Sequence, residues 1–507
     1  MLCLRAHHPL PPRARPRHEK SLSLLISSRT PPIPHLSLTH ISSLIKENAC
    51  EHVKTRHLFH GVLWCFTMDD THWVEMECAS AEMGDARLKK RMITILRSFF
   101  RSPRASIPEA SSSWPNIKAA YRFLNNPKVS HEAILASHRE ASEARFREEE
   151  VILAIQDTAV LNYTHHPETE GLGPVTRYPL SRGMLVHTTL AFTPEGVPLG
   201  IIDQQAYVRK ETEHGKKYAR HERPLSEKES EKWFTALEKT RQTRSRIGCD
   251  IVTVGDREAD IYELFQTDMP VLIRAAADRK LSSGRRLWGY LSSRPVRTMI
   301  TLTLPKRKGT PEATIEAELR FAEVEITPPK RKEDLPPVRL NAVYVRGGMV
   351  SWMLLTNLSL ASTDDALRYV RYYGCRFSIE VFHKALKSGC RIEERQLKTY
   401  EGLKRCLALY SIIAWRIMFA TMVGRSCPSL PCTVTLEDDE WKALVCYMED
   451  RKSPPRAPPS LGEAIVLIAK LGGFIGRRRD GHPGVTVLWR GMRQLQLLVR
   501  AWHAFRK

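Results

Sequence analysis

The chain has 507 residues and carries 78 Lys and Arg against 56 Asp and Glu, a formal net charge of +22. Hydrophobic residues make up 42% of the chain, which is typical of folded globular proteins and excludes collagen-like, low-complexity and wholly disordered chains. The positive charge predicts a polyanionic partner, with nucleic acid as the first candidate and an anionic membrane surface as the second. No apolar run approaches the roughly 20 residues of a spanning helix, so we expect no integral membrane protein.

The length predicts three or four domains at about 100–200 residues each. The eleven Cys are scattered without a paired C-x-x-C, which indicates free thiols in a reducing compartment. Residues 1–67 are poor in acids and rich in His and Pro, and we expect them to be disordered. They fit either a transit peptide or an over-long gene start, with Met68 as the true start, and the second interpretation is favoured.

A helical region follows over residues 68–145. Apolar residues recur at spacings of three and four between 75 and 100, and further helices are expected over about 116–124 and 130–145, the last capped by Ser130. Basic residues gather on the first two of these helices.

After residue 145 the spacing of the apolar residues changes from helical to strand-like. Short apolar runs at 151–155 and 250–254 are typical of strands buried on both faces of a sheet, and they alternate with a helix over 229–244. This predicts an α/β domain over residues 146–427. Within it, period-2 alternation over about 276–368 predicts a β-rich insertion of antiparallel strands. Residues 428–507 are expected to form a C-terminal helical region, with helices around 461–471 and 488–505.

Two acids follow the two apolar runs, Asp157 and Asp256. At the carboxyl ends of neighbouring strands their side chains can converge, and Mg²⁺ is the cation that suits such a pair. Asp256 has two rivals close by in the chain, Glu258 and Asp260. On its own, an Asp after a strand is more often a cap or turn residue.

A third element is the segment 373–387. At about 100° per residue, one helix would present four polar side chains within an arc of roughly 60°: Tyr373, Arg376, Glu380 and Lys387. One acid among cations suits a metal-bound phosphodiester. Taken alone, such a stripe is more often a solvated face, so composition and spacing indicate only a candidate metal-dependent phosphoryl-transfer site.

These residues resemble a known family, the cut-and-paste DDE transposases of bacterial insertion sequences, in the insertion sequence four family. Its signature of Tyr, two residues, Arg, three residues, Glu, six residues, Lys matches Tyr373, Arg376, Glu380 and Lys387 without a gap. Shorter matching stretches occur in the family's order from about residue 75 to the C-terminus, among them 84–85, 120–123, 181–183, 256–260 and 471–474.

The resemblance implies an α/β fold, with a ribonuclease-H-like catalytic core interrupted by the β-rich insertion, an N-terminal helical DNA-binding domain and a C-terminal helical dimerisation region. Asp157, Asp256 and Glu380 would be the DDE triad and would hold two Mg²⁺ ions per site, with Mn²⁺ as a substitute. The reaction would be strand hydrolysis at the element end, hairpin formation by the freed 3′-OH, and joining to target DNA.

The resemblance also implies the DNA contacts. Tyr373, Arg376 and Lys387 would hold phosphates, and Trp352 would stack against a flipped base, although a Trp beside a strand is usually core. The terminal inverted repeats would be bound by the N-terminal helices through Arg87, Arg91, Lys118 and Arg122. The partners would be double-stranded DNA and a second copy of the chain in a synaptic homodimer, in the bacterial cytoplasm with the nucleoid and without a membrane.

Other interpretations remain open. The first alternative is a catalytically silent repressor or inhibitor derived from a transposase, against which the presence of both Asp and all four signature residues argues. A stand-alone metal-dependent nuclease is another. Membrane-surface binding by the N-terminal basic segment is remote, because that segment lacks an amphipathic stripe.

Overall fold

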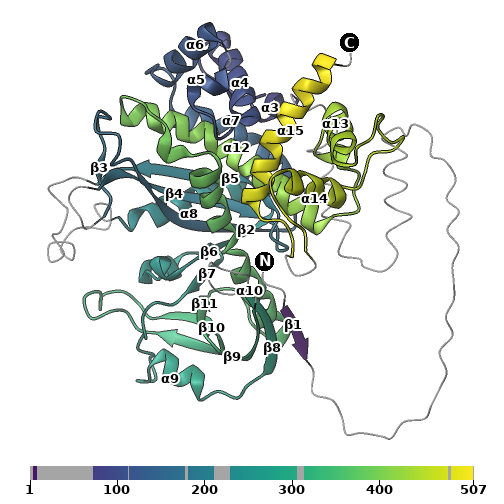
Figure 1. Ribbon diagram of the computed structural model, residues 1–507. Helices are drawn as coiled ribbons and strands as arrows, with labels where there is room; N and C mark the ends of the chain where they lie inside the picture. Colours follow the sequence, from purple (N-terminus) through teal and green to yellow (C-terminus); the bar gives the residue numbers. More distant parts are fainter. Residues whose placement is uncertain are drawn as a thin grey trace, which may run out of the picture.

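The computed structural model describes residues 4–7, 72–111, 113–176, 181–209, 229–304, 313–477 and 481–505. It has a mixed α/β architecture in which helical regions at both ends of the chain flank one large mixed sheet. Figure 1 shows the N-terminal helices at the top, the C-terminal helices beside them, and the β-rich insertion at the bottom.

The N-terminal region holds five helices: α3 (His72–Glu77), α4 (Ala86–Arg101), α5 (Ile107–Ser111), α6 (Trp114–Leu124) and α7 (His131–Phe146). α6 and α7 form where the sequence predicts them, whereas the pattern over 75–100 is divided between α3 and α4, and α5 was not predicted. Asp85 caps α4 by accepting a hydrogen bond from the Arg87 amide. The predicted cap of α7 is confirmed, since the Ala133 amide donates to Ser130 Oγ at 2.9 Å. These caps satisfy amides that the first turn of a helix leaves unpaired.

The central part of the sheet has the strand order β5-β4-β2-β6-β7. Its strands are β2 (Val151–Asn162), β4 (Arg182–Phe192), β5 (Pro198–Tyr207), β6 (Asp250–Gly255) and β7 (Val271–Arg274). β2 pairs antiparallel with β4 and parallel with β6, and β6 pairs parallel with β7. α8 (Glu231–Ile247) connects β5 to β6, and the two-residue strand β3 (Gly173–Pro174) pairs with β4.

The β-rich insertion extends this same sheet. β8 (Thr298–Leu304), β9 (Ala313–Ile326), β10 (Val338–Gly347) and β11 (Val350–Thr356) pair antiparallel in that order, and β11 joins β7. The short helix α9 (Leu287–Ser292) precedes them. Of the N-terminal extension, the structure describes only Leu4–His7, which form strand β1 on β8. The prediction of disorder was wrong for these four residues, and the remainder of 1–67 lies outside the described residues.

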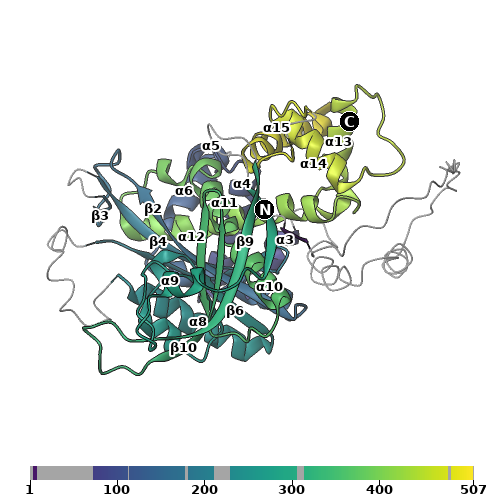
Figure 2. The same ribbon diagram turned by 90° about the horizontal axis from the view of Figure 1, so that it is seen from below.

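The chain then returns to helices. α10 (Thr363–Cys375), α11 (Ser378–Lys384), the π-helical turn η6 (Ala385–Gly389) and the 3₁₀ turn η7 (Ile392–Glu394) lead into the long helix α12 (Tyr400–Ser426). After the 3₁₀ turn η8 (Cys432–Val434) come α13 (Asp438–Met448), α14 (Leu461–Leu471) and α15 (Val485–Phe505). These last three helices gather on one side of the molecule (Figure 2). The eight cysteines within the described ranges are free thiols, as predicted.

Helix α12 corrects one expectation from the sequence. Among the described helices, it is long and apolar enough to cross a membrane by length and composition. In this fold 94% of its most apolar window is buried inside the protein. It packs against α4, α6 and α7, against β5, and against α14 and α15. Phe99 of α4 stacks on Tyr410 of α12 with ring centroids 5.1 Å apart, so α12 is the core helix that the terminal regions share.

A buried ion cluster fastens the N-terminal helices to the sheet. Glu77 accepts a hydrogen bond from Arg145 Nη1 at 2.6 Å and lies 2.5 Å from His138 Nδ1. Burial alone would raise the pKa of Glu77, but Arg145 and His138 outweigh it and hold that pKa at about 2. Arg145 Nε donates to the Leu199 carbonyl of β5, and His138 Nε2 accepts from the Ile201 amide.

Candidate active site

The strand register brings the two predicted Asp residues together. The parallel pairing of β2 and β6 runs as far as Ile155 opposite Val254, so Asp157 and Asp256 lie two residues beyond the same rung. β6 ends at Gly255, as predicted, but β2 does not end at Asp157. It continues to Asn162 because its other edge stays paired with β4, where Asp157 lies opposite Thr188. Asp157 is therefore a mid-strand residue at the point where the parallel pairing stops.

The structure separates Asp256 from its two rivals. Asp256 caps the 3₁₀ turn η4 (Arg257–Ala259), with Oδ1 accepting from the Glu258 amide at 2.8 Å. Asp260 is held elsewhere, in a buried ion pair with Arg279, and it also accepts hydrogen bonds from two backbone amides. Glu258 is exposed and lies 3.5 Å from Lys232. Of these three acids, Asp256 is the one whose charge acts on Asp157.

The predicted single-helix stripe was wrong. α10 ends at Cys375, α11 begins at Ser378, and the last signature residue lies in the π-helical turn η6. Tyr373, Glu380 and Lys387 therefore come from three consecutive helical segments, and Arg376 lies at the break between the first two. The break lets Tyr373 be fully buried while the Glu380 side chain remains about half exposed.

Arg376 lies between two of the predicted acids. Its Nη2 donates to Glu380 Oε1 at 2.7 Å, and its Nη1 lies 4.0 Å from Asp157 Oδ2. Burial raises the pKa of Asp157 to about 6, Arg376 opposes this rise, and the charges of Asp256 and Glu380 add to it. Asp256 and Glu380 are thus close enough for their charges to act on Asp157, and the guanidinium of Arg376 opposes the rise in the pKa of Asp157 without cancelling it.

His383 is a site residue that the sequence reasoning missed. Its Nδ1 lies 3.7 Å from Asp157 Oδ2, one helical turn after Glu380. Burial lowers its pKa to about 3, with Lys387 and Arg376 adding to the shift, so the imidazole is neutral at neutral pH. Among the described residues, Nε2 has no hydrogen-bond partner. The spacing of three from Glu380 was the available signal, because it places both side chains on one side of α11.

The donor set at this site fits a hard divalent cation. Carboxylate oxygens from Asp157 and Asp256 are the ligands that Mg²⁺ and Mn²⁺ accept. Burial is the main cause of the raised pKa of Asp157, and a bound cation would favour the ionised form of this carboxyl. Within the described ranges, no three His, Cys, Asp or Glu side chains are gathered closely enough to hold a metal. Glu380 is engaged by Arg376 instead and would have to turn away from it to join the two Asp residues.

The predicted base-stacking residue is buried in this structure. Trp352 of β11 is 5% exposed, and its ring lies 5.2 Å from that of Tyr373 and 6.1 Å from that of Phe377. Burial raises the pKa of Tyr373, which lies near Asp256 but also near Arg376 and Arg274. The role of Trp352 against a flipped base stays a prediction, and it would require the indole to leave this aromatic cluster.

An ion pair with Glu393 holds Lys387 close to the end of β2. Its Nζ lies 3.6 Å from Glu393 Oε1, and the same oxygen accepts a hydrogen bond from the Asn162 amide at 2.8 Å. The Lys387 side chain is partly exposed.

The four predicted DNA contacts lie on two adjoining helices. Arg91 of α4 donates to Asn116 of α6 at 3.4 Å, which links the helix carrying Arg87 to the helix carrying Lys118 and Arg122. The Arg87 side chain is 92% exposed and pairs with Asp85. Sequence reasoning missed Trp114, which is 65% exposed and carries Lys118 Nζ 5.2 Å above its ring. Trp114, Lys118 and Arg122 line one shallow hollow with Pro108, Ile117 and Tyr121.

Two segments of the chain match known protein families. Residues 70–129, which hold α3 to α6, match a family described as transposase DNA-binding. Residues 412–506, from the middle of α12 through α15, match the transposase Tn5 dimerisation domain. Together they support a transposase. They also support the expected DNA-binding and dimerisation roles of the two terminal regions.

The chain is also similar to solved structures. One of them is described as the cryo-EM structure of a piggyBac transposase synaptic complex with hairpin DNA. The match covers 72% of this chain and 75% of that chain at 11% identity, with a TM-score of 0.29.

Proposed function

We propose that this protein is a DDE transposase of the insertion sequence four family, with a ribonuclease-H-like catalytic core. The observation that carries the proposal is that Asp157 and Asp256 lie two residues beyond the last parallel rung of β2 and β6, while the charge of Glu380 acts on Asp157 from α11. Open α/β sheets bind their ligands at such strand ends. The two transposase domain matches on either side of this core support the same conclusion.

Asp157, Asp256 and Glu380 would hold two Mg²⁺ or Mn²⁺ ions, which supply Lewis-acid stabilisation and an activated water when bound. Arg376 presents a guanidinium that fits a phosphate in the same two-pronged manner as a carboxylate. We propose that the scissile strand's phosphate replaces Glu380 as its partner and so frees Glu380 for the site. The neutral His383, whose Nδ1 lies 3.7 Å from Asp157 Oδ2, would have to move closer to donate a hydrogen bond that holds Asp157 in place.

The proposed reaction proceeds by displacement at phosphorus. Water cleaves one strand at the element end, the freed 3′-OH attacks the opposite strand to form a hairpin, and a second water reopens it. The 3′-OH ends then attack target DNA. Terminal inverted repeats would be held by α4 and α6, and the C-terminal helices would join two copies in a synaptic homodimer. We place this activity in the bacterial cytoplasm, on the nucleoid.

A cleavage assay tests the proposal. The full chain would be incubated with Mg²⁺ and a duplex carrying the sequence that flanks its gene, and products would be read on a denaturing gel. A nick followed by a hairpin is expected. Sequence-specific binding without cleavage would instead support the repressor interpretation, and cleavage without joining to a second duplex would support a stand-alone nuclease.

Added Mg²⁺ should stabilise the protein at pH 7.5. The ionised Asp157 is unfavourable in the folded state, so its destabilising effect grows as the pH rises from about 3.8 through about 6 and is complete above that. A cation at saturating concentration removes it, and we expect thermal unfolding to shift upward by roughly 2 °C or more. Scanning calorimetry of wild type and Asp157→Asn measures this, and an equal shift in both proteins would contradict the assigned ligand.

The double variant Lys118→Gln/Arg122→Gln should bind DNA more weakly. Each lost phosphate contact lowers the slope of log K against log salt by about 0.9, so the slope should fall by about 1.8. Fluorescence anisotropy with a labelled duplex at several salt concentrations gives the slope. Arg339→Gln, on the exposed side of β10 in the insertion, is the control and should leave it unchanged.

A further inference from the structure

Four arginines from three regions of the chain converge on one surface. Arg104 lies between α4 and α5, Arg391 follows the turn η6, and Arg490 and Arg493 lie on α15. Burial lowers the pKa of Arg104, and the charges of the other three lower it further. Arg104 therefore lies close enough to each of the other three for their charges to act on it, and a bound anion would offset this repulsion.

A fifth arginine shows that the fold builds this arrangement. Arg395 is buried and donates to the carbonyls of Pro103, at 2.7 Å, and of Ala105 and Cys390. It thereby fixes the loop that bears Arg104 against the segment that bears Arg391. Arg391 itself adopts a left-handed conformation, with φ of 49°, which costs energy in a residue other than glycine.

A close approach of two elements positions the other two arginines. The indole of Trp489 on α15 packs over Gly389 of η6 so closely that a Cβ at that position would clash with it. Trp489 is 2% exposed, so this contact is part of the core. The residue that follows it, Arg490, and Arg493 one turn later are consequently held beside η6 with their side chains in solvent.

The acids nearby do not neutralise the arginines. Glu394 pairs with Arg391 at 3.1 Å and also acts on Arg104. Glu109 caps the start of α5 through Ser106, and the charge of Arg493 lowers its pKa after those hydrogen bonds. Within the described ranges, neither Arg490 nor Arg493 is found in an ion pair with a carboxylate.

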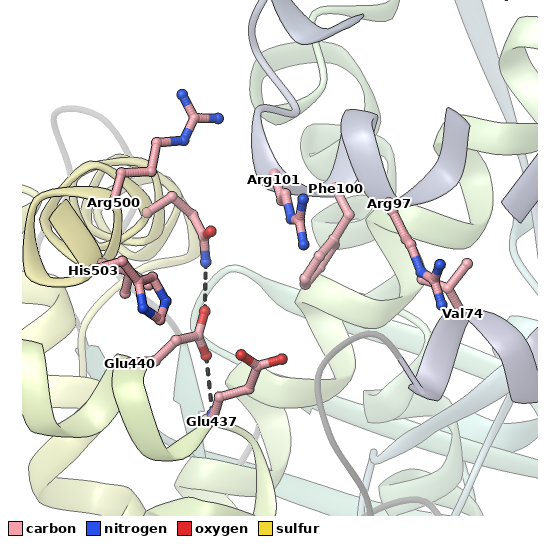
Figure 3. A pocket seen from close by; sticks show the side chains of 10 residues that line it. Val74, Arg97, Phe100, Arg101, Glu437, Glu440, Arg500 and His503 are labelled. Carbon is pink, nitrogen blue, oxygen red and sulfur yellow. Dashed lines mark hydrogen bonds between the residues drawn. The ribbon is translucent and has the colours of Figure 1, made fainter. Parts of the chain in front are cut away.

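The positive surface continues along the junction of α4 and α15. Arg490, Arg493, Leu497 and Arg500 follow one another at i, i+3, i+7 and i+10, which places them on one side of α15. Figure 3 shows the hollow at the far end of this junction, where Arg97, Phe100 and Arg101 of α4 lie across from Arg500 and His503. Glu437 and Glu440 line the same hollow, and Gln496 donates to Glu440.

We propose that Arg104, Arg391, Arg490 and Arg493 form a second DNA-backbone site, which holds duplex phosphates between the DNA-binding helices and the active site. Its position suits this role, since Arg104 follows α4 directly and Arg391 comes shortly after Lys387 in the chain. Guanidinium groups are the side chains best suited to phosphate oxygens. The inference rests on the proposed function, because it takes DNA as the substrate of that active site.

The test is a double variant, Arg490→Gln/Arg493→Gln, in the full chain. Anisotropy with a random-sequence duplex and with the gene-flanking duplex gives affinity at several salt concentrations. The inference predicts about tenfold weaker binding near 0.15 M salt and a slope lower by about 1.8, on both duplexes alike, since phosphate contacts carry no sequence information. Arg490→Lys/Arg493→Lys should retain most of the affinity. Arg451→Gln/Arg456→Gln, on the exposed loop after α13, is the matched control.

Three results would overturn the inference. One is that the double variant binds DNA with the same affinity and salt slope as a wild type that binds and cuts DNA. That result would leave the proposed function standing. Another is a changed dimer mass by light scattering without a change in DNA affinity, which would make this surface a contact between copies of the chain. The third is a loss confined to the flanking duplex. If the variant loses affinity as expected but wild type never cuts DNA, the proposed function fails and the DNA site remains.

Discussion

Asp256→Asn is expected to abolish DNA strand cleavage and to leave DNA binding intact. Asp256 is held by its own turn, with Oδ1 on the Glu258 amide, and an Asn oxygen can accept the same hydrogen bond, so the fold should be kept. The substitution removes one of the two negative charges with which Asp157 and Asp256 would bind a cation. Removing a residue that only supports a metal ligand lowers metal affinity or activity roughly 10–100-fold, so removing a ligand itself should lower the cleavage rate more. The gel assay for nicks and hairpins, with anisotropy for binding, measures both quantities.

The neighbouring acid provides a matched control. Glu258→Gln removes an exposed carboxylate two residues away, whose contact is with Lys232 rather than with the candidate site. It should cut DNA at close to the wild-type rate. Glu380→Gln should behave like Asp256→Asn. Cleavage that survives in Asp256→Asn, or that is lost equally in Glu258→Gln, would refute the assignment of the acids.

Glu77→Ala is expected to destabilise the protein by about 3–5 kcal/mol. The change leaves the Arg145 guanidinium and the His138 imidazole buried without their shared carboxylate, and breaking a buried ion pair from one side carries this cost. Because the folded pKa of Glu77 is about 2, below its ordinary 4.5, its contribution is complete above about pH 4.5. That contribution is lost as the pH falls toward 2. Urea unfolding of both proteins at pH 7 and pH 4 measures it.

A surface pair in the same helical region serves as the comparison. Glu132 bonds Arg139 at 2.7 Å, but its side chain is largely exposed, and pairs of this kind contribute about 0–1 kcal/mol. Glu132→Ala should therefore change the urea midpoint only slightly. If the two variants are destabilised equally, the cluster around Glu77 is not the fastening between the N-terminal helices and the sheet.

Features that depend on local pattern could be predicted from the sequence. The apolar runs before Asp157 and Asp256 are strands because β-branched and aliphatic residues fill both faces of the sheet there. Ser130 caps α7 because its hydroxyl is the nearest acceptor for the Ala133 amide. The alternation of apolar and polar residues between 298 and 356 likewise predicts the strands of the insertion. That these strands continue the central sheet follows from the pairing of β11 with β7.

Features that depend on contacts between distant segments could not be predicted. The extension of β2 beyond Asp157 comes from its pairing with β4. The break at Arg376 interrupts a segment whose polar residues have helical spacing, and it separates Tyr373 in the core from Glu380 in solvent. The helix α12 is mostly apolar, and helices, a strand and the C-terminal region cover it; an apolar sequence alone does not distinguish such a helix from a membrane span.

The pairing of β11 with β7 also affects how the molecule reaches its folded state. The strands of the insertion intervene in the chain between β7 and the helix that carries Glu380, so the segments that carry the three acids come together only after long loops have closed. Such high contact order slows folding. Until the loops close, α12 has no partners to cover it and exposes one of the most apolar surfaces of the chain to other molecules. Refolding at low protein concentration should therefore recover more native protein than refolding at high concentration.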